Sequence, residues 1–430
     1  MIDSKKNNLE AVDLLETLSN IKIDKDHFLW SNMTLARDRF LEYGVPMVRE
    51  EYWKFTEPSL FKKVNLLSKA PKQSCTVQGF ESNNDIKLVF LNGRFSQELS
   101  DKFDEPAIEI FSLNCLATEN IEWVKELYGK IEGISQEQVV RGFAALNTAV
   151  ASEGICIRIK ETINKKIVLT YLREDNHSDA IIHNLIKLDP GSSVTVIEKG
   201  IAGTLVNQVL EADIGANARL NHVRLQGRHD DSRILTHNFV QQQKNSSFKS
   251  FTMTLNGVLT RNECFVAMNG ADASMSISGA FIGNNSEHHD DTVFIKHNAE
   301  GCESRQVFKK VLKNRSVGVF QGKILVESEA QKTDGYQISK GLLLDKESNF
   351  LAKPELEIYA DDVICSHGST CGSLDEDSLF YLTSRGVSKQ IATDMLISAF
   401  VDEAIQEIEN NELADQAREI LAKDLESKVE

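Results

Sequence analysis

The stretches "LDPGSSVTVIE" (188–198) and "ADIGANARLNHV" (212–223) decide the fold. Each places Asp-x-Gly before a strand in which apolar and polar residues alternate, and the two Asp-x-Gly turns lie 24 residues apart. The stretch "GADASMSISGAFIG" (270–283) is a degenerate third copy. Irregular coils of about 20–25 residues are typical of a β-solenoid, in which each coil buries its face against its neighbours. A β-sandwich is the alternative, but the repeat favours the solenoid.

The same pattern continues on both sides of these copies, from about residue 155 to residue 365. Its short segments include "GICIRI" (154–159), "KIVLTYL" (166–172), "RILTHNFVQQ" (233–242) and "LEIYADDVIC" (356–365). Each is rich in Val, Ile, Thr or Phe and is bounded by Gly, Asn or Asp. More than ten such strands without an intervening helix predict a mainly β fold.

The regions before and after the strands have a different pattern. We expect a helical and mixed α/β domain over 1–150, a β-helix core over 151–372 and a helical domain over 373–430. Within the first region, residues 5–60 show helical spacing, and Asn92-Gly93 in "DIKLVFLNGRFS" predicts a hairpin. The finer signals there are a predicted C-cap at Gly44, mixed helix over 105–150, and apolar residues at Leu9, Val12, Leu15 and Leu18.

The C-terminal region predicts three helices. Ser373 and Glu376 form an expected capping box at the start of the first. The second, over 387–409, carries one apolar stripe, and the third covers 410–428. The stripe is expected to pack on the end of the solenoid, although docking of another protein is the alternative. Its residues are Ile391, Met395, Ala399, Phe400, Ala404 and Ile408.

Composition limits the compartment and the partners. The chain has 48 Lys and Arg against 64 Asp and Glu, a net charge of −16, which argues against nucleic acid as the main partner. No run of 18 apolar residues predicts a membrane span, and the acidic N-terminus resembles neither a secretory signal nor a transit peptide. We therefore expect a cytoplasmic protein whose seven scattered cysteines are reduced; they lie at 75, 115, 156, 264, 302, 365 and 371.

Two motifs invite a catalytic interpretation. "GVFQGKI" (318–324) has too few residues between its glycines for a phosphate-binding loop, and Ile324 replaces the required Ser or Thr, so we expect no bound nucleotide. "SEHHDDTVF" (286–294) could bind a metal or supply an acid and a base. On a strand, only Glu287, His289 and Asp291, or else His288 and Asp290, could converge. We interpret the stretch as a solvated turn.

The stretch "ADDVICSHGSTCG" (360–372) contains the strongest chemical candidates. Cys365 and His367 are two residues apart, so on a strand the thiol and the imidazole share a face. Thiolate and imidazole suit soft metals and sulfur chemistry, but two ligands do not complete a zinc or iron–sulfur site. The missing ligands would then come from another chain, or the pair is only a packed strand end.

Two other functions use these candidates differently. A self-contained zinc protein would use Cys302, Cys365, His367 and Cys371. A β-helix polysaccharide-active enzyme would use the His-His-Asp-Asp cluster. An aromatic content of only 7% leaves few residues to stack on sugars, which argues against the enzyme.

Four stretches carry a resemblance to a known family. They are "KPELEIYADDVICSHGSTCGSLDEDSLFYLTSRGVS" (353–388), "CESRQVFKKVLKNRSVGVFQGKILVESEAQKTDGYQISKGLLLD" (302–345), "REEYWKFT" (49–56) and "ALNTAVASEGICIRI" (145–159). Together they resemble the SufB/SufD family of iron–sulfur cluster assembly scaffolds, on its SufD side. The resemblance extends over nearly the whole chain, and 302–388 is its most specific part.

The resemblance implies a right-handed parallel β-helix between an N-terminal domain and a C-terminal helical domain. Such a subunit is not an enzyme. It pairs with SufB through the β-helices and binds the SufC ATPase through its C-terminal helices, which places Met395 and Phe400 in the docking region. An iron–sulfur cluster is assembled transiently with SufB. The interface used with SufB also allows a homodimer when the chain is isolated.

The resemblance also implies roles for the candidates. His367 matches the functionally important histidine of the family, and Cys365 matches the cysteine of the same motif, so both are expected at the assembly site. The sulfur-accepting cysteine belongs to SufB. Cys371 stands where the family has a small apolar residue, and we expect it to be a buried replacement.

Overall fold

A computed structural model of the chain describes residues 10–16, 27–62, 85–102, 105–114, 121–174, 179–226, 231–255 and 257–427. The predictions that involve Leu9, Leu18, Cys75 and Cys115 lie outside these residues. Among the described helices, none has the length and apolar character needed to cross a membrane.

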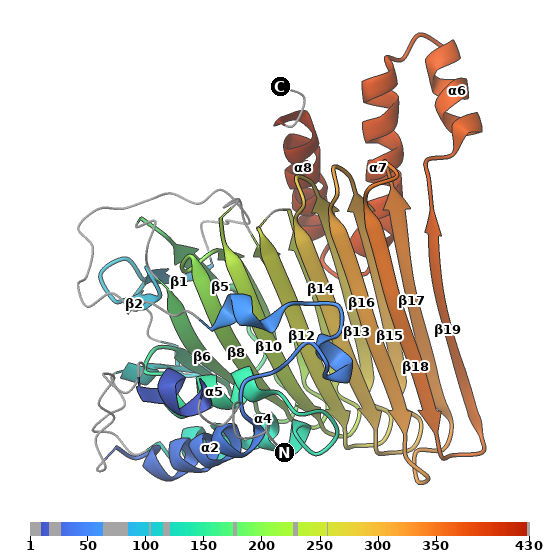
Figure 1. Cartoon of the computed structure of the whole chain (residues 1–430). Coiled ribbons are helices and arrows are strands. Elements are labelled where there is room, and N and C mark those ends of the chain that lie inside the picture. The colour runs from blue at the N-terminus through green and yellow to red at the C-terminus, as the bar shows by residue number, and fades with distance from the viewer. Residues whose placement is uncertain are drawn as a thin grey trace.

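The described strands form two sheets that coil around one axis (Figure 1). From β4 onward strands alternate between the sheets along the chain, and from β6 onward each pairs in parallel with the strand one coil earlier. Sheet A contains β1 (Ile86–Leu91), β2 (Arg94–Ser96), β5 (Ile167–Leu172), β7 (Ser193–Gly200), β9 (Arg219–Gln226), β11 (Ser247–Thr254), β13 (Ser274–Gly283), β15 (Glu303–Leu312), β17 (Thr333–Leu343) and β19 (Val363–Gly372). Sheet B contains β3 (Ile108–Ser112), β4 (Ile155–Ile159), β6 (Ala180–Leu188), β8 (Leu205–Ile214), β10 (Arg233–Gln242), β12 (Leu259–Met268), β14 (His288–His297), β16 (Val317–Val326) and β18 (Asn349–Ile358).

The predicted parallel β-solenoid is confirmed, and the expected coil length is wrong. Val194 pairs with Leu220, 26 residues later, and Val326 pairs with Ile358, 32 residues later. The Asp-x-Gly spacing underestimates the coil because the two motifs are not at equivalent positions. Leu188 pairs with Ile214, so Asp189 lies in the corner after β6, whereas Asp213 still lies within β8. Strands β1 and β3 extend the two sheets before residue 151, where we expected the β region to begin.

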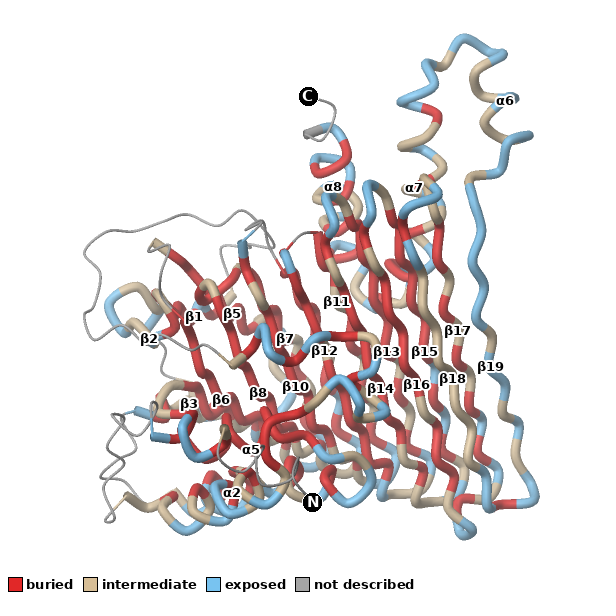
Figure 2. Tube along the Cα trace, in the orientation of Figure 1, coloured by how far each residue is buried: buried red, intermediate tan, exposed pale blue. Residues whose placement is uncertain are grey.

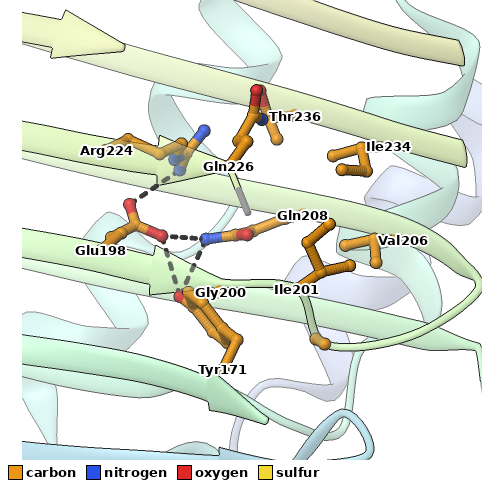
Figure 3. A pocket seen from close by; sticks show the side chains of 11 residues that line it. Tyr171, Glu198, Gly200, Ile201, Val206, Gln208, Arg224, Gln226, Ile234 and Thr236 are labelled. Atoms are coloured by element: carbon orange, nitrogen blue, oxygen red, sulfur yellow. Dashed lines mark hydrogen bonds and ion pairs between the residues drawn. The ribbon is translucent and has the colours of Figure 1, made fainter. Parts of the chain in front are cut away.

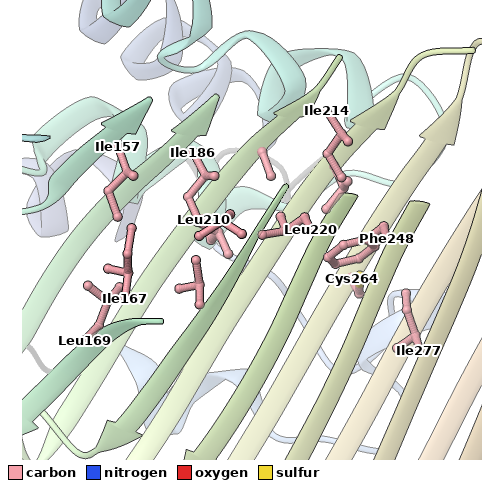
Figure 4. Packing of buried hydrophobic residues seen from close by; sticks show 14 of the residues in the cluster. Ile157, Ile167, Leu169, Ile186, Leu210, Ile214, Leu220, Phe248, Cys264 and Ile277 are labelled. Carbon is pink, nitrogen blue, oxygen red and sulfur yellow. The ribbon is translucent and has the colours of Figure 1, made fainter. Parts of the chain in front are cut away.

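The interior between the sheets is the main core. Inward positions of successive coils stack as apolar rows, as Figure 4 shows for Ile157 and Ile186 in sheet B and for Leu220 and Phe248 in sheet A. Because side chains alternate along a strand, the residues between these inward positions face outward. This stacking explains why the solenoid pattern is visible in the sequence.

Helices cover the outer face of sheet A. The second half of α7 (Lys389–Ile405) and α8 (Asn411–Ser427) bury Val401, Ala404 and Leu421 against outward residues such as Val223 and Val307. Packing of the stripe on the solenoid is therefore confirmed for Phe400, Ala404 and Ile408, whereas Ala399 is exposed. The expected capping box is wrong, because α6 (Glu376–Ser384) begins after Asp375, whose carboxylate accepts from the Asp377 N–H at 3.2 Å.

The N-terminal elements cover the outer face of sheet B. They are the helical residues 10–16, α2 (Trp30–Tyr43), α3 (Glu122–Leu127), α4 (Lys130–Ser135), α5 (Gly142–Val150) and the 3-10 turns η1 (Glu51–Trp53) and η2 (Pro58–Phe61). The predicted C-cap is confirmed, since Gly44 has φ of 75° and its N–H donates to Phe40 O at 2.8 Å. Helix through residue 60 is wrong, because the chain turns at Gly44. The hairpin is confirmed, with positive φ at Asn92 and Gly93.

The segment "REEYWKFT" contacts three strands of sheet B and so connects the N-terminal region to the solenoid. The guanidinium of Arg261 on β12 lies over the Trp53 ring, 4.2 Å from its centroid. Thr56 donates to Asp290 on β14 at 2.6 Å, and Tyr52 donates to Glu355 on β18 at 3.1 Å. Packing on Arg261 and the hydrogen bond to Asp290 explain why this segment needs an aromatic residue and a hydroxyl.

Candidate functional site

The solenoid ends in two unpaired strand edges. Within the described chain, β18 is the last strand of sheet B and β19 is the last strand of sheet A, each ten residues long. Most of β19 is exposed, and Ile364 is 74% exposed (Figure 2). Unpaired N–H and C=O groups along such an edge form a template for pairing with another chain.

The edge strand β19 carries the candidates from the sequence. Cys365 pairs in register with Gly335 and His367 with Gln337 on β17. Cys365 is half-buried in an apolar cluster with Ile324 and Leu356, which lies inside the solenoid, and burial raises the pKa of its thiol. Side chains alternate along a strand, so His367 points to the same interior face, where it is exposed at the open end.

Cys371 lies on the same face of β19 and is also exposed. The expectation of a buried replacement is wrong, because Cys371 is exposed and, among the described strands, no further coil covers β19. Cys371 and Cys365 are six residues apart on an extended strand, which separates them by about 20 Å. One metal ion cannot bind both thiols.

The four residues of the proposed zinc protein do not converge. Cys302 precedes β15, two strands from β19, and is fully buried with its Sγ 3.4 Å from Gly270 O. Among the described residues, no three His, Cys, Asp or Glu side chains lie in an arrangement that could hold a metal ion. The structure gives this alternative no support.

A second exposed surface lies on the C-terminal helices. Helix α6 has no buried residue and projects with the start of α7 beyond the strand ends (Figure 1). Phe380 is 72% exposed, and Tyr381, Ile391 and Met395 are each at least half exposed. Phe400 differs, because it is partly buried against the sheet A cluster with Lys309 over its ring. We call Phe380, Tyr381, Ile391 and Met395 the α6–α7 patch.

Comparison with known proteins agrees with this geometry. A family model described as "SUF system FeS cluster assembly, SufBD core domain" matches residues 171–400, more than half of the chain. The chain belongs to the SufBD family. The matched region contains the strands from β6 onward, including the edge strands, and most of α7.

Curated relatives place the SufBD chain within the family. It is 28% identical over 343 residues to "Iron-sulfur cluster assembly protein SufD" of Escherichia coli, covering 77% of this chain and 78% of the relative. It is 29% identical over 381 residues to a SufBD family protein of Synechocystis, covering 83% of each. It is 32% identical over 240 residues to "Protein ABCI7, chloroplastic" of Arabidopsis thaliana, covering 54% of this chain and 50% of the relative. The SufBD chain is SufD-like, and its function lies in iron–sulfur cluster assembly.

The His-His-Asp-Asp stretch of the SufBD chain is not a solvated turn. Residues 288–291 begin β14, and the side chains of His289, Asp290 and Asp291 are buried. The interpretation failed because partners distant in sequence neutralise these charges. Asp290 forms an ion pair with Arg261 on the outer face of sheet B. Arg261 comes from β12, one coil earlier.

Two of the predicted pairs converge, His288 with Asp290 on the outer face of β14 and His289 with Asp291 in the interior. Glu287 does not join them, because its carboxylate accepts from the Asn284 N–H at 2.8 Å. His288 and Asp290 both contact Thr56 on the outer face. Asp291 accepts from Lys310 Nζ at 2.7 Å in the interior, and His289 Nδ1 lies 2.7 Å from the same amine. Burial, followed by the charge of Lys310, lowers the pKa of His289, so its imidazole is neutral. Neither set can reach a polymer, and the polysaccharide-enzyme alternative has no support.

A polar cluster that the sequence analysis missed lies farther inside the solenoid (Figure 3). Glu198 accepts hydrogen bonds from Tyr171 at 2.9 Å, Gln208 at 2.5 Å and Arg224 at 2.7 Å, and His222 lies 2.8 Å away. Burial would raise the pKa of Glu198, but Arg224 and His222 outweigh burial and hold it far below its usual range. The adjoining cavity of about 20 Å³ has room for one water molecule. Charged residues at inward positions of the repeat were the available signal.

A buried histidine makes the stability of the SufBD chain depend on pH. His297 is fully buried beside Ser304 Oγ at 2.8 Å, and burial lowers its pKa from 6.5 to about 4. The unfolded chain therefore binds a proton between pH 6.5 and 4 that the folded chain does not. The contribution to stability is full above pH 6.5 and is lost as the pH falls through 4.

We expect the wild-type chain to lose about 2 kcal/mol more unfolding free energy than His297→Gln between pH 7 and pH 5. Glutamine keeps a polar group near Ser304 and does not titrate. Denaturant unfolding of both chains at the two pH values measures the difference. Equal losses in the two chains would show that His297 does not cause the dependence.

Proposed function

We propose that this chain is the non-catalytic SufD-like subunit of the SUF scaffold. It pairs with SufB through the open ends of the two β-helices and binds the SufC ATPase through its C-terminal helices. The observation that carries the proposal is the pair of unpaired ten-residue edges, β18 and β19, with His367 exposed on the second. Cytoplasmic localisation remains part of this proposal.

Strand addition would satisfy both edges at once. A second β-helix placed end to end would continue sheet A beyond β19 and sheet B beyond β18. Its interior would then face Cys365 and His367 at the joint. An iron–sulfur cluster needs about four ligands, so a pair of donors on this chain fits a site completed by SufB. The cluster is the product that is assembled there transiently and passed on.

His367 is the better ligand candidate of the two. It is exposed, and a neutral imidazole nitrogen binds iron. Cys365 is half-buried among apolar side chains, and its raised thiol pKa opposes formation of the thiolate. We therefore assign the main role to His367 and a supporting role to Cys365.

The α6–α7 patch is the proposed docking surface for SufC. Exposed aromatic and methionine side chains are typical of the centre of a protein interface. Met395 belongs to this surface, whereas Phe400 helps to hold α7 on the solenoid through Lys309. Because α7 packs on β13 and β15, movement of a bound ATPase would act on sheet A, which ends at the proposed SufB interface. Such coupling requires different contacts in the two nucleotide states.

Purification of the chain from its native cells tests the proposal. The expected result is copurification with an ATPase and with a paralogous β-helix protein, and little zinc in the isolated chain. A homodimer of the isolated chain would use the same edges and should dissociate when the paralogue is added. Stoichiometric zinc in the chain, with no ATPase or paralogue, would contradict the proposal.

A further inference from the structure

A row of polar side chains leads along the interior of sheet A to the open edge. Gln306 on β15, Gln337 on β17 and His367 on β19 occupy the same register position on consecutive strands. In-register neighbours in a sheet lie about 4.8 Å apart and point to the same face. The three side chains are therefore stacked from one coil to the next, with His367 last.

The two glutamines have unused hydrogen-bonding capacity. Both side chains are fully buried. Within the described chain, neither amide atom of Gln306 has a hydrogen-bond partner, and Oε1 of Gln337 has none. Nε2 of Gln337 makes one long contact, 3.4 Å, to Gly322 O. A buried acceptor left without a donor costs about 1–3 kcal/mol, so Oε1 of Gln337 favours any donor brought within reach.

A glycine across the interior makes room for this amide. Gly322 on β16 faces Gln337, and a Cβ at Gly322 would lie 2.6 Å from Oε1 and 2.7 Å from Nε2. No side chain therefore separates the amide from sheet B. The amide of Gln337 therefore lies against Gly322, on the strand next to the one that carries His367.

We propose that Gln337 is the positioning residue for His367, an inference that rests on the proposed function. Once a partner covers β19 and removes water from the ring, Gln337 Oε1 accepts the imidazole N–H. This hydrogen bond fixes one tautomer and leaves the lone pair of the other ring nitrogen directed at the joint. Metal-binding histidines almost always donate their second N–H to such an acceptor, and losing it costs 10–100-fold in affinity or activity.

Two substitutions at Gln337 separate positioning from packing. Gln337→Met keeps the size and removes the acceptor, so cluster formation by the assembled complex should fall about 10–100-fold. Gln337→Glu keeps an oxygen acceptor and should retain most of the wild-type rate. In thermal stability Gln337→Met should exceed Gln337→Glu, because burying a carboxyl group costs more free energy than burying a thioether. A packing role would make activity follow stability.

Gln306→Met is the matched control, since Gln306 is equally buried and lies one strand farther from His367. It should leave the rate of cluster formation near that of the wild type. A wild-type rate in Gln337→Met, or an equal loss in Gln306→Met, would overturn the proposal. If Gln337→Glu does not fold, the comparison of the two methionine variants decides.

His367→Ala is the reference that separates the two proposals. A large loss of cluster formation in His367→Ala with no loss in Gln337→Met would reject the positioning role of Gln337 but not the proposed assembly site. Normal cluster formation in His367→Ala would instead reject the proposed assembly site. The same reconstitution, with iron and a sulfur source followed by cluster absorbance, measures all four variants.

Discussion

His367→Ala should leave the complex assembled and its ATPase active while cluster formation falls at least about 100-fold. The size follows because loss of a ligand should cost at least as much as the largest loss of a supporting hydrogen bond. Reconstitution with iron and a sulfur source, followed by cluster absorbance, measures the effect. Cys365→Ala should be milder, because its thiol is half-buried and its pKa is raised.

We do not expect His367→Ala to reduce cluster formation through a loss of stability. His367 is exposed in this chain, and surface substitutions usually change stability by no more than about 0.5 kcal/mol. Ser366→Ala is a suitable control, because Ser366 is exposed on the opposite face of β19. Normal cluster yield from His367→Ala, or an equal loss from Ser366→Ala, would contradict the assignment.

Met395→Lys should weaken SufC binding about 30-fold or more while leaving the solenoid folded. Removing an anchor at the centre of an interface typically costs at least about 2 kcal/mol, and an inserted charge adds a desolvation cost. Met395 is 50% exposed, so unfolding free energy should change little. Titration calorimetry with SufC measures binding, and denaturant unfolding measures stability.

Glu419→Gln is the matched control for Met395→Lys. It changes the charge by the same amount at an exposed position on α8, outside the α6–α7 patch. Unchanged SufC affinity in Met395→Lys would contradict the docking assignment. Deletion of 373–430 would be a poorer test, because it would expose Val223 and Val307 on the outer face of sheet A.

Local sequence predicts the solenoid because its coils repeat a local pattern. A turn followed by an alternating strand recurs from coil to coil, as in β7 and β9, where Val194 pairs with Leu220. The length of a coil is harder to predict from the sequence, because the corners can contain extra residues while the strands keep their pairing. The helical stripe after residue 387 is also a local signal. The periodicity of this stripe does not reveal which part of the helix is covered, and in the structure Ala404 is buried while Met395 is exposed.

Buried charges show the limit of local patterns most clearly. Four consecutive polar residues at 288–291 look like a turn, yet Lys310 and Arg261 neutralise two of them inside and outside the sheet. Those partners come from two other strands, β15 and β12, 19 and 29 residues away in sequence. The candidate pair Cys365 and His367 could be predicted from the sequence for a different reason. Residues two apart on a strand share one face regardless of the coils around them.

Hydrogen exchange at the two edge strands tests the central claim most directly. The account predicts that amides of residues 349–358 and 363–372 exchange readily in the free monomer and become strongly protected when SufB is added. Strands β1 and β2 at the other end of sheet A should show no change. Equal exchange of β18 and β19 with and without SufB would contradict pairing through the open end and the shared site at His367.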